Sequence, residues 1–225
     1  RGVYRKMKAG AFLCYVARLK GREGPDVRRK VREWLERVDL ADIENKKCEE
    51  LSKGMQQKLQ FLSTVIHEPD LLILDEPTDG VDPVGRAAIR DVVLELKHKG
   101  TTIFINSHLL MEVEMVCDRV VIMDKGRILR EGTIAELTPY TGAVRFEIDP
   151  VPEDLTHLLA GVGAGLTRHD HGFDLAAGPD EVDRAVDLLR GAGVSIRSLM
   201  PRRLNLEQTF IDLVKAEADK DKGLQ

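Results

Sequence analysis

The chain has 225 residues, 43% of them hydrophobic, so one or two domains with substantial cores are expected. Its 34 basic and 38 acidic residues give a formal net charge of −4, and the two signs are mixed along the sequence. This excludes the basic stripe typical of DNA- and RNA-binding proteins, so no nucleic-acid partner is expected. The three cysteines, Cys14, Cys48 and Cys117, are odd in number and widely spaced, which indicates reduced thiols and no disulfide framework.

The first fifty residues are predicted to be helical. One helix is expected around 9–20 and a second from Asp26, whose apolar residues fall on one face: Val27, Val31, Trp34, Leu35 and Val38. The second helix also carries four basic residues, Arg28, Arg29, Lys30 and Arg32. We interpret them as a solvated face, with a contact to lipid headgroups or to a partner as the alternative.

No apolar run approaches the roughly 18 residues that span a bilayer. Residues 5–17 have the basic-then-apolar order of a signal peptide, but the apolar part is short and falls on one helical face. An amphipathic helix is therefore the better interpretation, and a membrane role would require a partner subunit.

A helix start is predicted at LSKGMQQK, residues 51–58. Ser52 is a good N-cap, and Gly54 allows a backbone to approach closely. The N–H groups and the dipole at such a helix start attract phosphate. Helical spacing continues through Leu59, Leu62, Val65 and Ile66. On its own, this pattern is most often an ordinary capped helix.

The segment LLILDEP, residues 71–77, is an apolar strand that ends in two carboxylates, Asp75 and Glu76. An uninterrupted apolar run suits a strand buried on both faces of a parallel sheet, and ligands bind at the carboxyl end of such strands. In nucleotide-hydrolysing enzymes one carboxylate there holds Mg²⁺ and another accepts a proton from water. The alternative is a strand that ends in a solvated acidic turn.

Downstream, DGVDP at 79–83 predicts a turn in which Asp82 caps a helix that Pro83 begins. That helix would bury Ile89, Val92, Val93 and Leu96 and end at Gly100. A second strand, TTIFIN at 101–106, is followed by Ser107 and His108. If the two strands are neighbours, His108 lies at the same sheet edge as the carboxylates.

Together these segments resemble the ATP-binding cassette (ABC) family of ATPases over residues 1–137. LSKGMQQK is similar to the family signature, LLILDE to its Walker B strand, DGVDP to its D-loop and Ser107-His108 to its switch histidine. Residues 117–137 resemble the stretch after the switch, with a strand at 120–123 that turns at 124–126 into another. The resemblance implies an α/β fold: a partial P-loop NTPase cassette with a helical subdomain at 1–50 and the signature and catalytic half at 51–140.

The resemblance also implies roles for individual residues, with ATP and Mg²⁺ as cofactors. Asp75 would position Mg²⁺, Glu76 would polarise the attacking water and His108 would hold the γ-phosphate. Cassettes of this family pair head to tail, so ATP held by one would be closed over by the signature of the other, here Ser52, Lys53, Gly54 and Met55. Asp82 would communicate between the two sites. The implied partners are a second cassette and transmembrane permease subunits.

The chain departs from the family pattern at specific positions. Family members usually carry a glycine and a glutamine where this chain has Lys53 and Met55, so the signature loses an amide and gains a charge. In the D-loop, Asp79 and Val81 replace the commoner small hydroxyl residue and leucine. We interpret these differences as variation within the exporter branch.

The sequence contains no Walker A loop, G-x-x-x-x-G-K-[ST], whose backbone and lysine cradle the phosphates. Because the chain also starts at Arg1, just past the family's Q-loop, we expect the carboxyl-terminal part of a longer polypeptide, inactive by itself. The longer protein is expected to be an ATP-hydrolysing exporter subunit, cytoplasmic and peripheral at the inner face of the membrane. The alternatives are a soluble ABC ATPase acting on ribosomes or DNA, and a non-catalytic regulatory fragment.

A separate module is predicted at 143–217, after a linker at 138–142. Alternation at Val144, Phe146 and Ile148 indicates a strand. A helix near 153–160, strands near 164–176, a helix burying Val182, Ala185, Val186 and Leu189, and a strand at 194–199 complete a β-α-β-β-α-β order. This order predicts a small ferredoxin-like α+β accessory domain. Because no residue in it matches a nucleotide-contacting motif, we expect a regulatory or dimer-stabilising role.

A last helix is expected from Asn205, with Gln208 placed for a capping box, before a tail at 218–225. Its LEQTFIDLV resembles the end of the accessory domain of drug- and sodium-type exporter ATPases. His169 and His171 are interpreted as part of a polar hairpin, because a metal site needs a third ligand.

Overall fold

The computed structural model describes residues 3–223, with side chains described up to residue 219. The chain divides into two compact units, Arg1–Val116 and Cys117–Gln225. Of the expected tail at 218–225, residues 218–223 continue the last helix, whereas 224–225 lie outside the described residues, as do 1–2. Within the described range, no helix combines the length and the apolar character needed to cross a bilayer.

The first unit contains five α-helices, two 3₁₀ turns and two strands within its described residues. They are α1 (Ala9–Leu19), α2 (Asp26–Arg37), η1 (Ala41–Ile43), η2 (Cys48–Glu50), α3 (Lys53–Val65), β1 (Leu71–Asp75), α4 (Pro83–His98), β2 (Thr102–Asn106) and α5 (Leu110–Val116). The helices and strands predicted in this region are confirmed. The five apolar residues expected on one face of α2 are all buried.

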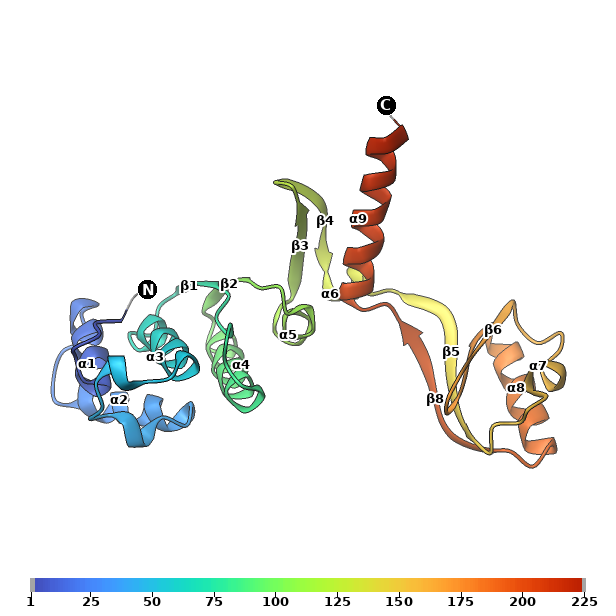
Figure 1. Ribbon diagram of the computed structural model, residues 1–225, viewed down its shortest axis with the longest axis horizontal. Helices are drawn as coiled ribbons and strands as arrows, with labels where there is room; N and C mark the ends of the chain where they lie inside the picture. Colours follow the sequence, from blue (N-terminus) through green and yellow to red (C-terminus); the bar gives the residue numbers. More distant parts are fainter. Residues whose placement is uncertain (1–2, 224–225) are drawn as a thin grey trace. The chain divides into compact units, whose positions relative to one another are not determined.

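Strands β1 and β2 pair in parallel, from Leu71 opposite Thr102 to Asp75 opposite Asn106. Leu72 and Leu74 are buried, whereas Ile73 is 71% exposed. The expectation that β1 is buried on both faces is therefore wrong within the described residues. Figure 1 shows the reason, since α3 and α4 lie on the same side of the two strands.

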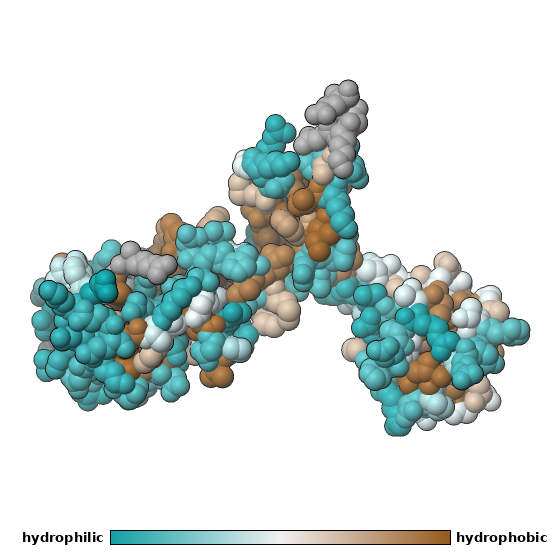
Figure 2. Space-filling model, in the orientation of Figure 1, coloured by the Kyte–Doolittle hydropathy of each residue, from teal (hydrophilic) through white to brown (hydrophobic). Residues whose placement is uncertain are grey.

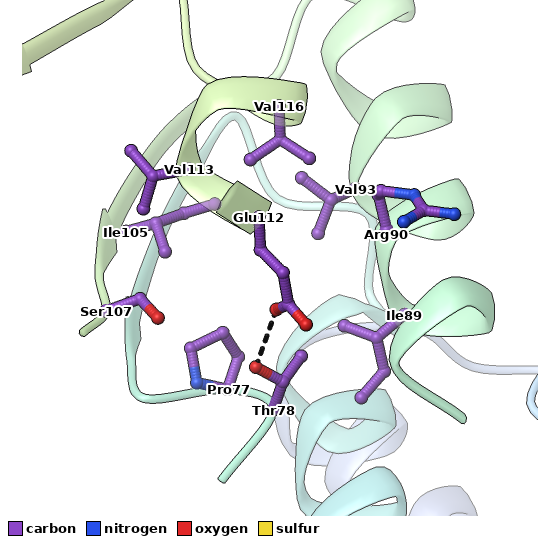
Figure 3. A pocket seen from close by; sticks show the side chains of 10 residues that line it. All are labelled: Pro77, Thr78, Ile89, Arg90, Val93, Ile105, Ser107, Glu112, Val113 and Val116. Carbon is purple, nitrogen blue, oxygen red and sulfur yellow. Dashed lines mark hydrogen bonds between the residues drawn. The ribbon is translucent and has the colours of Figure 1, made fainter. Parts of the chain in front are cut away.

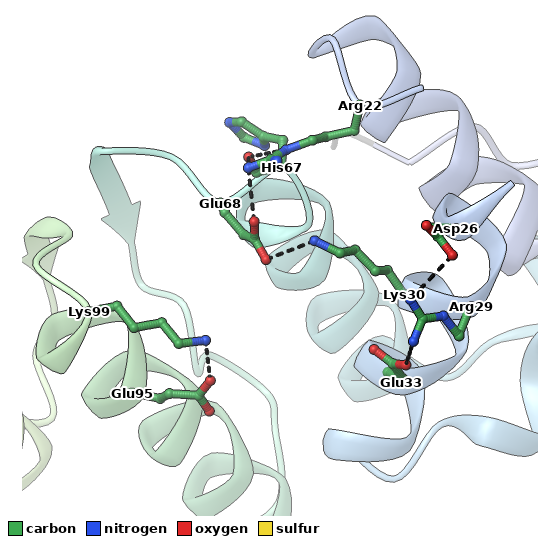
Figure 4. Close-up of polar contacts among 9 residues, drawn as sticks. All are labelled: Arg22, Asp26, Arg29, Lys30, Glu33, His67, Glu68, Glu95 and Lys99. Atoms are coloured by element: carbon green, nitrogen blue, oxygen red, sulfur yellow. Dashed lines mark hydrogen bonds and ion pairs between the residues drawn. The ribbon is translucent and has the colours of Figure 1, made fainter. Parts of the chain in front are cut away.

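Ion pairs tie α2 to the loop between α3 and β1 (Figure 4). Glu68 accepts hydrogen bonds from Arg22 at 2.9 Å and from Lys30 at 3.1 Å. Arg22 also donates two hydrogen bonds to the carbonyl oxygen of His67, at 3.0 and 2.9 Å. Partial burial favours the protonated acid, but the hydrogen bond from Lys30 and the charges of Lys30, Arg22 and Lys99 leave the pKa of Glu68 below its ordinary value.

The basic cluster of α2 is largely paired with acids. Lys30 contacts Glu68, and Arg29 lies between Asp26 and Glu33 on the same helix. Arg32 contacts Glu44 at 3.3 Å. These pairs are mostly solvent-exposed, so the interpretation as a solvated face holds, although most of its charge is neutralised locally.

The second unit consists of two sheets and four α-helices within its described residues. Its elements are β3 (Arg119–Asp124), β4 (Arg127–Thr133), α6 (Ile134–Leu137), β5 (Tyr140–Asp149), α7 (Leu155–Leu158), β6 (Gly165–His169), β7 (Gly172–Ala176), α8 (Pro179–Gly191), β8 (Ser195–Arg203) and α9 (Leu206–Gly223). Strands β3 and β4 form the predicted antiparallel pair. Their apolar side chains Val121, Met123 and Ile128 are exposed, and hydrophobic surface gathers near β3, β4 and α9 in Figure 2.

The other four strands form an antiparallel sheet in the order β6-β7-β5-β8. The predicted β-α-β-β-α-β order is confirmed, and its core centres on Phe146 and Phe173, whose stacked rings lie 4.7 Å apart. The predicted linker at 138–142 is wrong in its second half. Tyr140 already belongs to β5 and pairs with Arg203 of β8, because the two strands extend beyond the sheet core.

Helix α9 begins where expected, since the Asn205 side chain accepts a hydrogen bond from the Gln208 amide at 2.8 Å. The capping box is only half formed, because the Gln208 side chain donates to Asp212 instead. Thr209 donates to the carbonyl oxygen of Leu137 in α6 at 2.7 Å. The start of α9 thus packs against α6, and none of the α9 side chains that the structure describes belongs to the core around Phe146.

A polar cluster on the four-stranded sheet centres on Asp174, whose side chain is only 8% exposed. Arg145 holds both of its carboxylate oxygens, and Arg202 donates to one of them. The hydrogen bond from Arg145 outweighs the opposing effect of burial, so the pKa of Asp174 is lowered. His169 lies 3.9 Å from the same carboxylate. Among the described residues, no group of three or more His, Cys, Asp or Glu side chains is arranged to hold a metal.

Candidate functional site

The carboxyl ends of β1 and β2 bring the predicted site residues to one edge. Because Asp75 lies opposite Asn106 in the parallel register, the Asn106 amide nitrogen donates to the Asp75 carboxylate at 2.6 Å. The next backbone group continues the pairing, since the Glu76 amide donates to the Asn106 carbonyl at 2.9 Å. The sequence patterns did not mark Asn106 as a site residue. Its position at the carboxyl end of the strand TTIFIN was the one signal that could have done so.

Glu76 leaves the strand in a left-handed conformation, with φ at 45°. Such a conformation is uncommon for a residue with a side chain and persists only where the surroundings impose it. Here it accompanies a close approach to the residues after β2. The Glu76 carboxylate accepts a hydrogen bond from the His108 amide at 3.1 Å and lies 2.8 Å from the His108 Nδ1 atom. The structure therefore brings Glu76 and His108 into direct contact.

Ser52, Lys53, Gly54 and Met55 form the start of α3. The Ser52 hydroxyl accepts a hydrogen bond from the Met55 amide at 3.2 Å, which confirms the predicted N-cap. Ser52 and Lys53 are exposed, so the amino end of α3 faces solvent. A Cβ atom on Gly54 would lie 2.9 Å from the Gly80 carbonyl oxygen, so the glycine is needed for the contact with the 79–83 turn.

Gln57 connects α3 with the end of β1. Its side-chain amide donates to the carbonyl oxygens of Glu76, at 3.0 Å, and Pro77, at 3.3 Å. This contact is not predictable from the sequence. A polar residue in the second turn of a helix carries no signal of which strand end it will meet.

Asp82 occupies the N-cap position of α4, but its side chain accepts no capping hydrogen bond. The predicted N-cap position of Asp82 and the helix start at Pro83 are therefore confirmed, but the capping hydrogen bond expected of an aspartate is not formed. The turn is held from α4 instead, since Arg86 donates from Nε to the Val81 carbonyl oxygen at 2.8 Å. The Asp82 carboxylate thus remains on the exposed surface.

A small pocket of about 30 Å³ lies behind this edge, between the end of β2 and helices α4 and α5 (Figure 3). Its lining is mainly apolar, and Glu112 of α5 accepts a hydrogen bond from the Thr78 hydroxyl at 2.9 Å. The pocket has room for about a water molecule, far less than a nucleotide requires. The Thr78–Glu112 contact instead anchors the segment after His108 to the turn after Glu76.

The edge contains a carboxylate suited to a divalent cation. Asp75 is exposed, and the structure gives it a hydrogen bond to Asn106 through one carboxylate oxygen. Mg²⁺ prefers oxygen ligands and is commonly held by one or two carboxylates, with water and substrate phosphates completing its shell. The donor set at Asp75 fits that pattern.

Comparisons with known proteins agree with this arrangement. The family model described as ABC transporter matches residues 7–79. The ABC transporter ATP-binding protein YhaQ of Bacillus subtilis (strain 168) is 38% identical over 218 residues, which cover 96% of this chain and 72% of YhaQ. The daunorubicin resistance ATP-binding protein DrrA3 of Streptomyces coeruleorubidus is 34% identical over 194 residues, covering 83% of this chain and 61% of DrrA3.

A solved structure described as the ATP binding subunit of an ABC transporter superposes with a TM-score of 0.56 at 30% identity. The match covers 60% of this chain and 56% of that structure. The chain thus spans between about half and three quarters of the length of these three proteins.

Proposed function

The chain belongs to the ATP-binding proteins of ABC transporters, and on that premise we propose that it supplies one half of an ATP-hydrolysing site. The observation that carries this proposal is the direct contact between Glu76 and His108 beside Asp75, at the carboxyl edge of two parallel strands. A carboxylate in contact with an imidazole can accept a proton from water that attacks a phosphate. The start of α3 would supply the phosphate-facing surface for a second cassette.

Each residue has a distinct proposed role. Glu76 orients the attacking water and accepts its proton, while His108 holds the γ-phosphate and fixes the Glu76 carboxylate through their hydrogen bonds. Asp75 would hold Mg²⁺, which when bound neutralises charge on the phosphates. Ser52 and Gly54 face the phosphates of ATP bound to the partner cassette, and Asp82 contacts that partner. Lys53 and Met55 complete the same surface.

The 225 residues contain no Walker A loop, so the site becomes complete only with a phosphate-binding loop from outside them. We propose that the chain by itself neither hydrolyses ATP nor binds it tightly. In the assembled transporter, two cassettes would close on ATP, and this conformational change would be transmitted to transmembrane permease subunits at the inner face of the membrane. The similarity to DrrA3, named for drug resistance, supports an exporter. The 143–217 module, which lacks nucleotide-contacting motifs, would regulate or stabilise the dimer.

Two preparations test this proposal. The purified chain should show an ATPase rate at background and no tight ATP binding by calorimetry, both before and after the Glu76→Gln substitution. An assembly that includes a phosphate-binding loop should hydrolyse ATP and lose that activity with Glu76→Gln. ATP hydrolysis by the chain alone, abolished by Glu76→Gln, would show that a separate phosphate-binding loop is unnecessary. Full turnover of the assembled Glu76→Gln variant would contradict the proposed catalytic role.

A further inference from the structure

Two side chains on one face of α3 hold the two ends of the turn at residues 76–79. Lys53 and Gln57 are four residues apart, so they project from the same side of the helix. Gln57 donates to the Glu76 carbonyl oxygen at 3.0 Å. The Lys53 ammonium donates to the Asp79 carboxylate at 2.9 Å. The turn is also closed internally, because the Asp79 amide donates to the Glu76 carbonyl oxygen at 3.2 Å.

Lys53 and Asp79 are two of the positions at which the sequence departs from the commoner family pattern. A lysine at the first position of a helix is unfavourable, because the amino end of a helix carries a partial positive charge. Asp79 places a carboxylate beside that charge. The two departures therefore offset each other electrostatically.

The packing of Lys53 against Gly80 also supports a contact between the start of α3 and the segment after Glu76. Gly80, at φ 71°, continues the chain after Asp79, and a Cβ atom there would lie 3.0 Å from the Lys53 Cε and Nζ atoms. The stem of Lys53 thus covers Gly80 while its ammonium reaches Asp79. The Gly80 carbonyl in turn lies against Gly54. The first turn of α3 and the segment after Glu76 are in contact through both backbone and side chains.

We propose that Lys53 and Asp79 form a positioning pair for Glu76. The left-handed conformation of Glu76 requires support from its surroundings. Gln57 supplies that support at the start of the turn, and the Lys53–Asp79 pair supplies it at the end. The effect of the pair on turnover rests on the proposed function, whereas the pairing itself is testable in the chain alone.

Hydrogen exchange tests the pairing without ATP. The reporter is the Val81 amide, which donates to the Thr78 carbonyl oxygen at 3.1 Å. Lys53→Met and Asp79→Asn should each speed its exchange by about two- to fivefold at low salt, the range expected for an exposed ion pair. In the double variant the Val81 amide should exchange no faster than in either single variant. Lys53→Arg should exchange at the wild-type rate. About 1 M salt should remove the differences in exchange rate between the variants and the wild type. Lys99→Met, which removes a separate exposed pair with Glu95, is the matched control.

Turnover of an assembly with a phosphate-binding loop separates positioning from direct contact with phosphate. If the pair positions Glu76, Lys53→Met and Asp79→Asn each lower kcat by about two- to fivefold, without additivity and with little change in the KM for ATP. An increase in KM with Lys53→Met, and no effect of Asp79→Asn, would show that Lys53 acts only through the nucleotide-facing surface and not through Asp79, and would overturn the proposal. The proposal would also be overturned if Lys53→Met and Asp79→Asn changed the exchange rate of the Val81 amide additively, or not at all, in the chain alone. This holds whatever the ATPase activity of the assembly.

Discussion

The Glu76 carboxylate lies 2.8 Å from the His108 Nδ1 atom and also accepts the His108 amide hydrogen bond at 3.1 Å. These residues are 32 positions apart in the sequence, and the parallel pairing of β1 with β2 brings them together. The proposed function assigns this contact to phosphate chemistry at the edge of the sheet.

Replacement of His108 by alanine should suppress ATP turnover by roughly 10²-fold or more in an assembly that includes a phosphate-binding loop, because the proposed phosphate contact and the orientation of Glu76 are both lost. Steady-state ATPase assays at saturating ATP measure this. His98→Ala, at the exposed end of α4, is the matched control and should retain full turnover. Wild-type rates in His108→Ala would show that the role of this histidine is misassigned.

Removal of the Ser52 cap should destabilise the first unit by about 0.5–2 kcal/mol, because the Met55 amide loses its acceptor. Urea unfolding of Ser52→Ala, followed by the fluorescence of Trp34, measures the change. Trp34 is buried in the first unit and is the sole tryptophan of the sequence. Ser63→Ala is the control, since that hydroxyl only bonds back to Gln60 within the same helix. Equal effects of the two substitutions would argue against the cap.

Acid should weaken the second unit through Asp174. The pKa of this carboxyl is lowered in the folded state, so its stabilising effect is present above its ordinary pKa and is lost as the pH falls through the lowered value. At pH 7, Asp174→Asn should cost about 1–3 kcal/mol, because Arg145 and Arg202 lose their charged acceptor. The difference from wild type should shrink on acidification.

Hydrogen exchange of the core amides of β5 and β7 between pH 3 and pH 7 measures this dependence. Asp149→Asn is the control, since Asp149 and its partner Arg197 are both 65% exposed. A difference between Asp174→Asn and wild type that stays constant across this range would contradict the linkage.

Loss of the Glu68 charge should loosen the connection between α2 and the loop before β1. Glu68→Gln weakens two exposed ion pairs, so a loss of about 1 kcal/mol or less is expected at low salt, with a smaller loss at high salt. Because the pKa of Glu68 is lowered, this contribution is present above its ordinary pKa and disappears on acidification. Urea unfolding monitored at Trp34 provides the measurement, with Glu33→Gln as the control. A larger loss of stability in Glu33→Gln than in Glu68→Gln would show that the Glu68 contacts do not make the main contribution to this connection.

The sequence predicts local elements well because apolar spacing and end signals are local properties. Ser52 was identified as a cap, and Ile89, Val92, Val93 and Leu96 were identified as the buried stripe of α4. The four-stranded sheet followed from the alternation at Val144, Phe146 and Ile148 and from the order of the elements after it.

Contacts between distant segments could not be predicted in the same way. Asn106 meets Asp75 only because of the strand register, and Gln57 meets Glu76 only because of the packing of α3 on the end of β1. The exposure of Ile73 was missed since an apolar run indicates a strand that can be buried on both faces, without indicating what covers it. Asp82 was placed correctly at the N-cap of α4 because its residue type fits that position, but residue type alone does not determine whether the side chain accepts a capping hydrogen bond.

The most direct test of the account is the ATP turnover of Glu76→Gln in an assembly that includes a phosphate-binding loop. Glutamine keeps the shape of the side chain but cannot accept the proton from water, so ATP binding should persist while turnover falls by roughly 10²-fold or more. Glu36→Gln, an exposed substitution on α2, should leave both unchanged. Wild-type turnover in Glu76→Gln would contradict the assignment of this carboxylate as the general base.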